Sequence, residues 1–287
     1  MLQHETATLN GVEIHYVRDG RGPTMLFLHG FPQFWYAWRE QLDAFSADHQ
    51  VVAPDLPGYN LSGKPDDVAA YAAPQVAAIM RALVDRVSPG QPVVLVGHDW
   101  GGIVAWAFAI AFPTYLSHLV IINAPHPAII ARELATNPAQ QQAMGYAVRF
   151  RQPGAEALLG AGDYAALAGA LFAGAARAEA FSPADHDAYR AAWAQPGALT
   201  GMLNYYRASA LGPPPGSPAP DLTVRAPTLV LWGEQDRALL TGNLDGLEAF
   251  VPDLQVQRIP AGTHWVVHEE GPQITAAIRA FITPASG

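Results

Sequence analysis

The chain of 287 residues contains no cysteine and only one lysine, Lys64. Without cysteine it can form no disulfide, no thiolate metal site and no thiol nucleophile. No apolar stretch reaches the roughly 18 residues that a membrane-spanning helix needs. The first residues also lack the basic segment and apolar run of a signal peptide. We therefore expect a soluble, cytoplasmic protein with no membrane partner.

Basic residues are scarce as well. Lysine and arginine total 16 against 25 aspartates and glutamates, which gives a formal net charge of −9. Nucleic acids and anionic membranes attract basic patches, so neither is an expected partner. Half of the residues are apolar, which is enough for one sizeable core.

Apolar runs alternate with helix-like segments through the first 124 residues. A run such as TMLFL, apolar throughout, is typical of a strand buried on both faces of a sheet. Alternation of strands and helices predicts a mostly parallel sheet with helices on both faces, an α/β fold. We expect strands at 13–17 (an edge strand), 24–28, 50–53, 92–96 and 119–122, and helices at 38–45, 73–87 and from 103.

The alternation stops at residue 123. An alanine-rich stretch of helical character extends to about residue 211, and a proline-dense connector, LGPPPGSPAP, follows. Strand-like runs resume at 228–232 and 255–259, with a last helix at 272–281. We predict one α/β core built from residues 1–124 and 225–287, with residues 125–224 inserted as a helical cap.

The most informative residue is Asp99, in a turn between a strand and a helix. The strand expected at 92–96 leads into GHDWGG at 97–102, and an apolar helix-like stretch begins at Ile103. Small residues around such a junction are typical of a nucleophile elbow, which usually carries serine. A carboxylate there would attack saturated, electrophilic carbon and form an alkyl ester. The alternative is a glycine-rich turn with a helix-capping aspartate.

Two later strand ends supply an acid and a base in the chain order nucleophile, acid, histidine. Asp236 in GEQDR is the expected acid, with Glu234 as second choice. His264 in PAGTHW is the expected base, and His268 is the weaker candidate because it lies in helix-like sequence. We expect His98 to point away from the nucleophile and to have a structural role.

The loop HGFP at 29–32 follows a buried strand, where a backbone N–H can be aimed at an oxyanion. The expected donors are the N–H groups of Phe31 and Trp100. We also expect Phe31, Trp35, Trp100 and Trp265 to line a pocket that prefers apolar or aryl groups over charged ones.

Together these segments resemble the soluble, capped bacterial epoxide hydrolases of the α/β-hydrolase superfamily. The similar stretches cover nearly the whole chain in the family's order: HGFPQFWYAWR, PDLPGYNLSGKP, GHDWGG, NAPHP, QPGALTGMLNYYRA and the segments around Asp236 and His264. The resemblance implies an α/β-hydrolase fold and hydrolysis of apolar or aryl epoxides to vicinal diols, a detoxification chemistry. It implies no metal and no organic cofactor, a small epoxide and water as partners, and a monomer or homodimer.

The resemblance also implies two cap tyrosines that hydrogen-bond the epoxide oxygen. By position these look like Tyr146 and Tyr206, whereas the residues alone leave Tyr164, Tyr189 and Tyr205 equally open. Tyr205 stands where the family often has tryptophan, which favours a packing role. Arg149 and Arg151, near Tyr146, replace residues that are usually aromatic or neutral.

The implied mechanism starts with attack of Asp99 on the epoxide, and His264, held by Asp236, then activates water against the ester. A haloalkane or haloacid dehalogenase with the same nucleophile is one alternative. Dehalogenases often hold the halide with a side-chain N–H after His-Gly, where this chain has Phe31, and those acting on fluoroacetate carry arginine at the position of Trp100. A non-catalytic ligand-binding protein of this fold is the other alternative.

Overall fold

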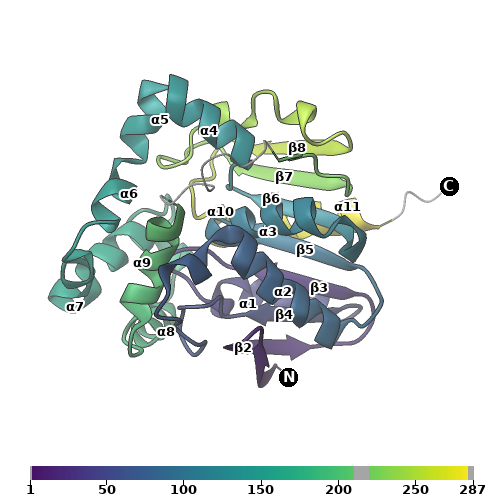
Figure 1. Ribbon diagram of the computed structural model, residues 1–287, viewed down its shortest axis with the longest axis horizontal. Coiled ribbons are helices and arrows are strands. Elements are labelled where there is room, and N and C mark those ends of the chain that lie inside the picture. The colour runs from purple at the N-terminus through teal and green to yellow at the C-terminus, as the bar shows by residue number, and fades with distance from the viewer. Residues whose placement is uncertain (1, 210–219, 284–287) are drawn as a thin grey trace.

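A single eight-stranded sheet organises the computed structural model, which describes residues 2–209 and 220–283 (Figure 1). Its strand order is β1-β2-β4-β3-β5-β6-β7-β8. β1 (Gln3–Leu9) and β2 (Val12–Asp19) form an antiparallel pair, and β2 is antiparallel to β4. The other neighbours are parallel: β4 (Gln50–Pro54), β3 (Thr24–Leu28), β5 (Val93–His98), β6 (Leu116–Ile122), β7 (Thr228–Gly233) and β8 (Leu254–Ile259). The predicted mostly parallel sheet is confirmed.

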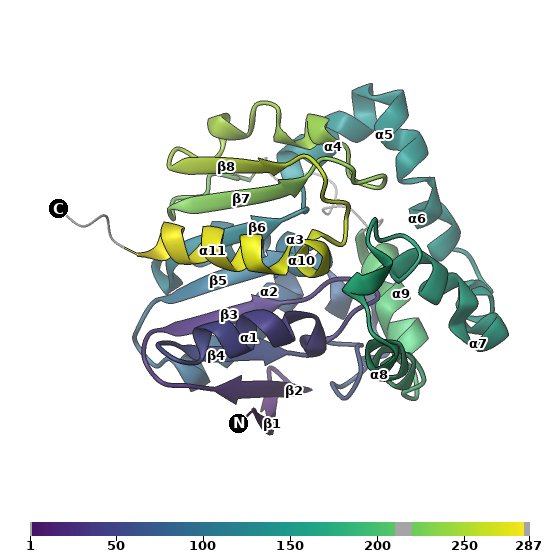
Figure 2. The ribbon, with the colours of Figure 1, turned by 180° about the vertical axis from the view of Figure 1, so that it is seen from behind.

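Helices cover both faces of this sheet. Figure 1 shows α2 (Ala73–Val87) and α3 (Trp100–Ala111) in front of it, and Figure 2 shows α1 (Arg39–Phe45) and α11 (Gly271–Ile282) on the opposite face. Every residue of β3 and β5 is buried. Because successive strand side chains point to opposite faces, alternate residues enter separate apolar layers. The apolar runs of the sequence reflect this burial on both sides.

One strand was not predicted. The segment expected at 13–17 forms β2, but the edge position belongs to β1, which pairs outside it. Only Ala7 and Leu9 of β1 are buried. A half-exposed edge strand has little apolar periodicity, so no clear pattern indicates a strand there.

The segment between β6 and β7 is helical, although these two strands are neighbours in the sheet. We call residues 127–209 the helical insertion, and Figure 1 shows it beyond one end of the strands. It comprises α4 (Pro127–Thr136), α5 (Pro138–Ala143), α6 (Gly145–Phe150), α7 (Ala155–Leu171), α8 (Pro183–Trp193) and α9 (Ala198–Ser209). As expected, the described residues between 125 and 224 contain no strand. The expected connector at 211–220 lies outside the described residues except for its last residue.

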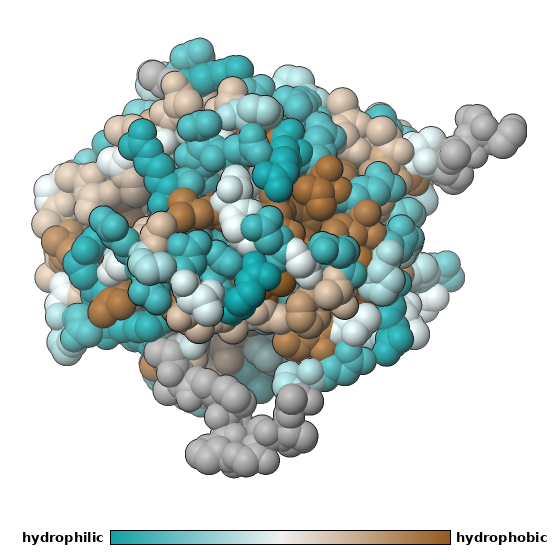
Figure 3. Space-filling view, turned by 90° about the horizontal axis from the view of Figure 1, so that it is seen from above, coloured by the Kyte–Doolittle hydropathy of each residue, from teal (hydrophilic) through white to brown (hydrophobic). Residues whose placement is uncertain are grey.

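The remaining elements are short. They are α10 (Val266–Glu269) and the 3-10 turns η1 (Trp35–Trp38), η2 (Val68–Tyr71), η3 (Pro113–Tyr115), η4 (Ala178–Ala180), η5 (Thr241–Leu244) and η6 (Leu247–Ala249). The face seen in Figure 3 is largely hydrophilic, and its hydrophobic atoms form separate groups. In the described part of the chain, no helix combines the length and the apolar character that a bilayer crossing requires.

The helical insertion rests on loops of the sheet. The α9 glycine Gly201 lies so close to Gly58 that a Cβ on either residue would overlap the other backbone. Nearby, the Tyr205 hydroxyl donates to the carbonyl of Pro57 at 2.9 Å. The Trp193 indole N–H donates to the carbonyl of Pro32 at 2.6 Å. These contacts fix α9 on the loop that contains Pro57 and Gly58, and α8 on the loop that carries Phe31.

Candidate active site

Asp99 occupies the junction between β5 and α3. Its φ of 51° and ψ of −123° place a non-glycine residue in a sparsely populated backbone region. The side chain accepts no capping hydrogen bond from α3, so the helix-capping alternative does not describe it. A Cβ at Gly30 would overlap the Asp99 side chain, so only glycine lets the neighbouring loop approach. The turn therefore presents the carboxylate outward, as expected of a nucleophile elbow.

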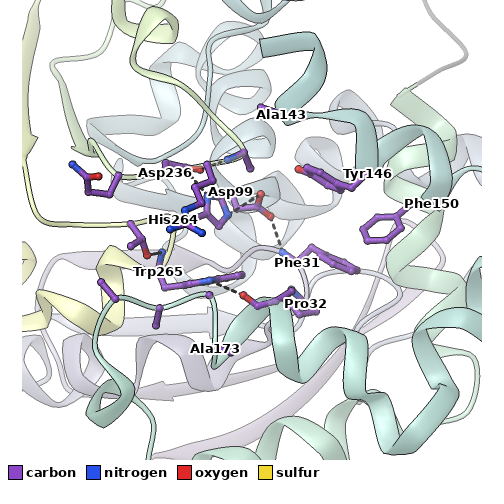
Figure 4. A pocket seen from close by; sticks show the side chains of 18 of the residues that line it. Phe31, Pro32, Asp99, Ala143, Tyr146, Phe150, Ala173, Asp236, His264 and Trp265 are labelled. Carbon is purple, nitrogen blue, oxygen red and sulfur yellow. Dashed lines mark hydrogen bonds and ion pairs between the residues drawn. The ribbon is translucent and has the colours of Figure 1, made fainter. Parts of the chain in front are cut away.

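The loop at 29–32 reaches this carboxylate. The Phe31 N–H donates to Oδ1 of Asp99 at 2.7 Å, and this hydrogen bond is buried. Figure 4 shows Asp99 between His264 and Tyr146, with Phe31 beside it. The N–H of Phe31 thus lies where an oxyanion formed on the Asp99 carboxyl group would need a donor.

His264 connects Asp99 to Asp236. Its Nδ1 lies 2.7 Å from Oδ2 of Asp236, and its Nε2 lies 3.4 Å from Oδ2 of Asp99. The three residues come from loops after β5, β7 and β8, whose carboxyl ends share one edge of the sheet. The residues predicted as nucleophile, acid and histidine therefore lie side by side, joined by one hydrogen bond and one ion pair.

The charges in this series stabilise one another. Burial opposes the charged form of His264, but the Asp236 carboxylate, together with Asp99, raises its pKa to about 10. Burial likewise opposes ionisation of both carboxyl groups, yet His264 lowers the pKa of Asp99 and of Asp236. At neutral pH the site therefore holds a protonated imidazole between two carboxylates.

Asn123 holds the acid and was not singled out from the sequence. Its Nδ2 donates to Oδ2 of Asp236 at 2.8 Å, and its Oδ1 accepts the Gly233 N–H at 2.8 Å. The N–H groups of Ala238 and Leu239 donate to the other carboxylate oxygen at 2.8 and 2.9 Å. A polar residue directly after the strand β6 was the available signal, since three other strand ends carry site residues.

The competing candidates lie elsewhere. Glu234 pairs with Arg258 at 3.0 Å, away from the imidazole. His268 contacts Gln33 at 2.6 Å, and burial lowers its pKa well below the ordinary value. His98 lies 2.8 Å from the backbone carbonyl of His264, and burial lowers its pKa to about 4. A neutral His98 therefore supports the loop of His264 from behind, which agrees with the expected structural role.

A cavity of about 550 Å³ opens above Asp99. Of the five open tyrosines, only Tyr146 on α6 and Tyr206 on α9 line it. Their rings lie 6.1 Å apart, and burial together with the Asp99 charge raises the pKa of both phenols. Both hydroxyls therefore stay protonated and can donate hydrogen bonds near the carboxylate.

The expected aromatic lining is partly wrong. Phe31 and Trp265 line the cavity, but Trp35 and Trp100 do not. Trp35 packs against His4 with 5.4 Å between ring centroids, on the far side of its loop. Trp100 points its ring at Tyr206, 5.1 Å away, and supports that tyrosine instead of a ligand. Whether these side chains enter the cavity depends on the direction in which each points from its helical turn, and the sequence does not specify that direction.

Small residues that the sequence analysis did not single out form much of the remaining wall. These lining residues are Ala143, Ala170, Ala173, Gly174, Ala175, Ala176 and Ala238. The Trp265 indole N–H donates to the Ala170 carbonyl at 2.9 Å, and Glu269 accepts the N–H of Ala176. The loop of His264 thus holds the alanine-rich wall in place. The sequence shows that this stretch is rich in alanine, but only the fold shows that these small residues line a cavity.

Comparison with known proteins fits this geometry. Residues 23–271 match the family described as the alpha/beta hydrolase fold. The chain is 35% identical to the AB hydrolase superfamily protein YfhM of Bacillus subtilis, over 95% of each chain. It is 34% identical to epoxide hydrolase 4 of Mus musculus, over 95% of this chain and 77% of that protein.

A solved structure extends the likeness to three dimensions. The epoxide hydrolase of Bacillus megaterium in complex with an inhibitor matches with a TM-score of 0.90 and 33% identity, over 97% of this chain and 99% of that one. The two sequence matches and this structure match all span nearly the whole chain. The chain belongs to the α/β-hydrolase fold family, among relatives that are named epoxide hydrolases.

Proposed function

We propose that this protein is an epoxide hydrolase that converts apolar or aryl epoxides to vicinal diols through an ester on Asp99. The observation that carries the proposal is the position of the Asp99 carboxylate, which faces one cavity together with two protonated tyrosines. Residues 1–124 and 225–287 would be the catalytic core and residues 125–224 the cap. The enzyme would act in the cytoplasm, as a monomer or homodimer.

The first step is ring opening. Tyr146 and Tyr206 donate hydrogen bonds to the epoxide oxygen, and an Asp99 oxygen attacks a ring carbon from the side opposite the breaking C–O bond. The alkoxide that leaves takes a proton from a tyrosine, and a hydroxyalkyl ester remains on Asp99. A carboxylate whose pKa is lowered is available for this attack at neutral pH.

Formation of the ester prepares the base for the second step. Asp99 helps to raise the pKa of His264 to about 10, and an ester carries no charge to do so. The pKa of His264 therefore falls once Asp99 is alkylated, and its proton can restore the tyrosine. Neutral His264, oriented by Asp236, then removes a proton from the attacking water.

Water attacks the carbonyl carbon of Asp99 rather than the substrate. The tetrahedral oxyanion is stabilised by the N–H of Phe31, which contacts this carboxyl group at 2.7 Å. We assign the second donor to the N–H of Trp100, the residue after the nucleophile. Loss of one such donor typically costs about 2.7–4 kcal/mol of transition-state stabilisation. Collapse releases the diol and regenerates Asp99.

A dehalogenase reaction with the same nucleophile is less well supported. Halide release needs side-chain N–H donors beside the reacting carbon, but Phe31 has none. The Trp265 indole N–H is engaged with the Ala170 carbonyl, and Trp100 is not among the described residues that line the cavity. Two tyrosines suit an oxygen leaving group, because a phenol can protonate an alkoxide.

The test is a single turnover of styrene oxide in ¹⁸O-water, followed by mass spectrometry of the diol and of the peptide with Asp99. We expect the label in Asp99 and largely unlabelled diol in the first turnover. Labelled diol with unlabelled Asp99 would mean direct attack by water and would refute the ester mechanism. If no diol forms, release of halide from haloalkanes becomes the next measurement.

A further inference from the structure

Arg237 is a charged group in the cavity that the reaction does not use. It follows the acid Asp236 directly and lines the same cavity as Asp99. Its backbone is fixed, since the N–H groups on its carboxyl side, of Ala238 and Leu239, both donate to Asp236. Arg237 is exposed. The described residues provide it with no hydrogen bond, ion pair or ring contact.

An arginine without a partner is unusual in this chain. All 16 lysines and arginines lie in the described ranges, and most are bound to a carboxylate, a hydroxyl or a backbone carbonyl. The exceptions are Arg21, Arg149 and Arg237, and of these only Arg237 lines the cavity. Acidic residues are plentiful, with 25 in the chain, yet none pairs with it.

The other polar side chains at this part of the cavity are already engaged. The Gln235 amide donates to the Pro260 carbonyl at 3.0 Å, and the Thr263 hydroxyl donates to Glu269 at 2.8 Å. Among the residues that line the cavity, the two negative charges of Asp99 and Asp236 are balanced by the positive charges of protonated His264 and Arg237. The net charge of −9 therefore does not prevent anion binding, because distant exposed charges are screened beyond about 8 Å at physiological salt.

We propose that the physiological epoxide carries a carboxylate at a distance from the ring, and that Arg237 binds it while Asp99 attacks the epoxide. This inference rests on the proposed function and names the substrate class of the same site. The small-residue wall accepts an apolar or aryl body, and the guanidinium offers a planar pair of donors that matches a carboxylate. A cavity of about 550 Å³ is large enough for one such molecule to touch both groups. This proposal departs from the sequence-based expectation of a preference against charged groups.

The test compares two substrates that differ only in charge, 4-(glycidyloxy)benzoate and its methyl ester. The variants are Arg237→Gln and Arg237→Lys, and the matched control is Arg149→Gln, which removes an equally unpaired arginine outside the cavity lining. We expect Arg237→Gln to lower kcat/KM for the carboxylate about fivefold to tenfold through KM, as for one partly exposed ion pair. The ester should be hydrolysed as before, Arg237→Lys should recover part of the loss, and Arg149→Gln should change neither substrate.

The outcomes separate the two proposals. Equal losses on both substrates in Arg237→Gln would show a structural role and overturn the inference, while the proposed function stands. An unchanged ratio of the two kcat/KM values would overturn it as well. If the wild-type protein hydrolyses neither epoxide, the proposed function itself fails. As a readout independent of turnover, calorimetry should show that the diol product of 4-(glycidyloxy)benzoate binds the wild type more tightly than Arg237→Gln, and raised NaCl should weaken that binding.

Discussion

The sheet and the helical insertion contribute to the site in different ways. The sheet supplies Asp99, Asp236 and His264 from the ends of parallel strands. Asp99 accepts the Phe31 N–H, and Asp236 accepts from Asn123 and from backbone N–H groups. The backbone carbonyl of His264 accepts from the His98 side chain. The insertion supplies Tyr146 from the partly exposed α6 and Tyr206 from α9, most of which is buried. In the proposed mechanism, one region fixes the reacting groups and the other surrounds the substrate.

The difference follows from how each region is packed. β3, β5 and β7 are buried throughout, so their ends have little freedom to move. In contrast, α7 is interrupted by non-helical backbone angles at residues 161–164, and an added Cβ at Gly169 would have nothing within 4 Å. Catalytic groups need precise positions, which the buried strands of the sheet provide. The helical insertion is less tightly packed, so its residues can change to suit a different substrate.

Replacing His264, the proposed base in the sheet region, should lower turnover more than any other change considered. We expect His264→Gln to lower steady-state turnover by about 10³-fold or more, because water loses its general base. Alkylation of Asp99 should still proceed, so intact mass spectrometry should show an adduct with the mass of enzyme plus substrate. Asp99→Asn serves as the control and should form none. An adduct-free His264→Gln protein that is fully folded would contradict the division into two steps.

Changes in the insertion should act on ring opening alone. We expect Tyr206→Phe and Tyr146→Phe each to lower the rate of alkylation by about tenfold to a hundredfold, since one phenol can still donate. The double variant should lose far more, measured by stopped-flow of the first turnover. Tyr205→Phe is the matched control, because the Tyr205 hydroxyl binds the Pro57 carbonyl and not the cavity. An equal loss in Tyr205→Phe would argue against the assigned pair.

The coupling within the sheet region can be measured directly as a pKa. His264 titrates near pH 10 partly because of the charge on Asp99, so Asp99→Asn should lower that pKa. The raised pKa favours the folded state fully below about pH 6.5, the ordinary histidine pKa, and this contribution is lost as pH rises through about 10. NMR titration of the imidazole would detect the change, with the exposed Asp187→Asn as control. An unchanged pKa would mean that alkylation of Asp99 cannot release the His264 proton.

The smallest expected effects are changes in the free energy of unfolding when either of two glycines in the insertion is replaced. Gly201 touches Gly58 beneath α9, and Gly201→Ala should destabilise the protein by about 1–3 kcal/mol through overpacking. Gly169 lies exposed in α7 with nothing within 4 Å of an added Cβ. Gly169→Ala should therefore stabilise the protein by about 0.5–1 kcal/mol. Chemical denaturation gives both values, and destabilisation by Gly169→Ala would mean that α7 is not the helix described.

Much of this site could be predicted because short sequence patterns around each residue indicate where it lies in the fold. The turn at Asp99 needs small neighbours, and Asp236 and His264 each follow an apolar strand. Chain order therefore predicts a triad, and the structure brings these three residues together. The predicted aromatic lining of the cavity was wrong for Trp35 and Trp100, because no periodicity in the sequence indicates where these side chains point. Trp35 and Trp100 are as aromatic as Trp265, but only Trp265 lines the cavity.

By itself the sequence determined the parallel sheet and the helical insertion, and it predicted Asp99, Asp236 and His264 as nucleophile, acid and base. These depend on side-chain burial and backbone propensity within a few residues of each position. Only the tertiary structure decided which of five tyrosines meet above Asp99, that Asn123 holds Asp236, and that Arg237 lines the cavity without a partner. Such facts depend on contacts between residues far apart in the chain, and no local pattern encodes the distance between them.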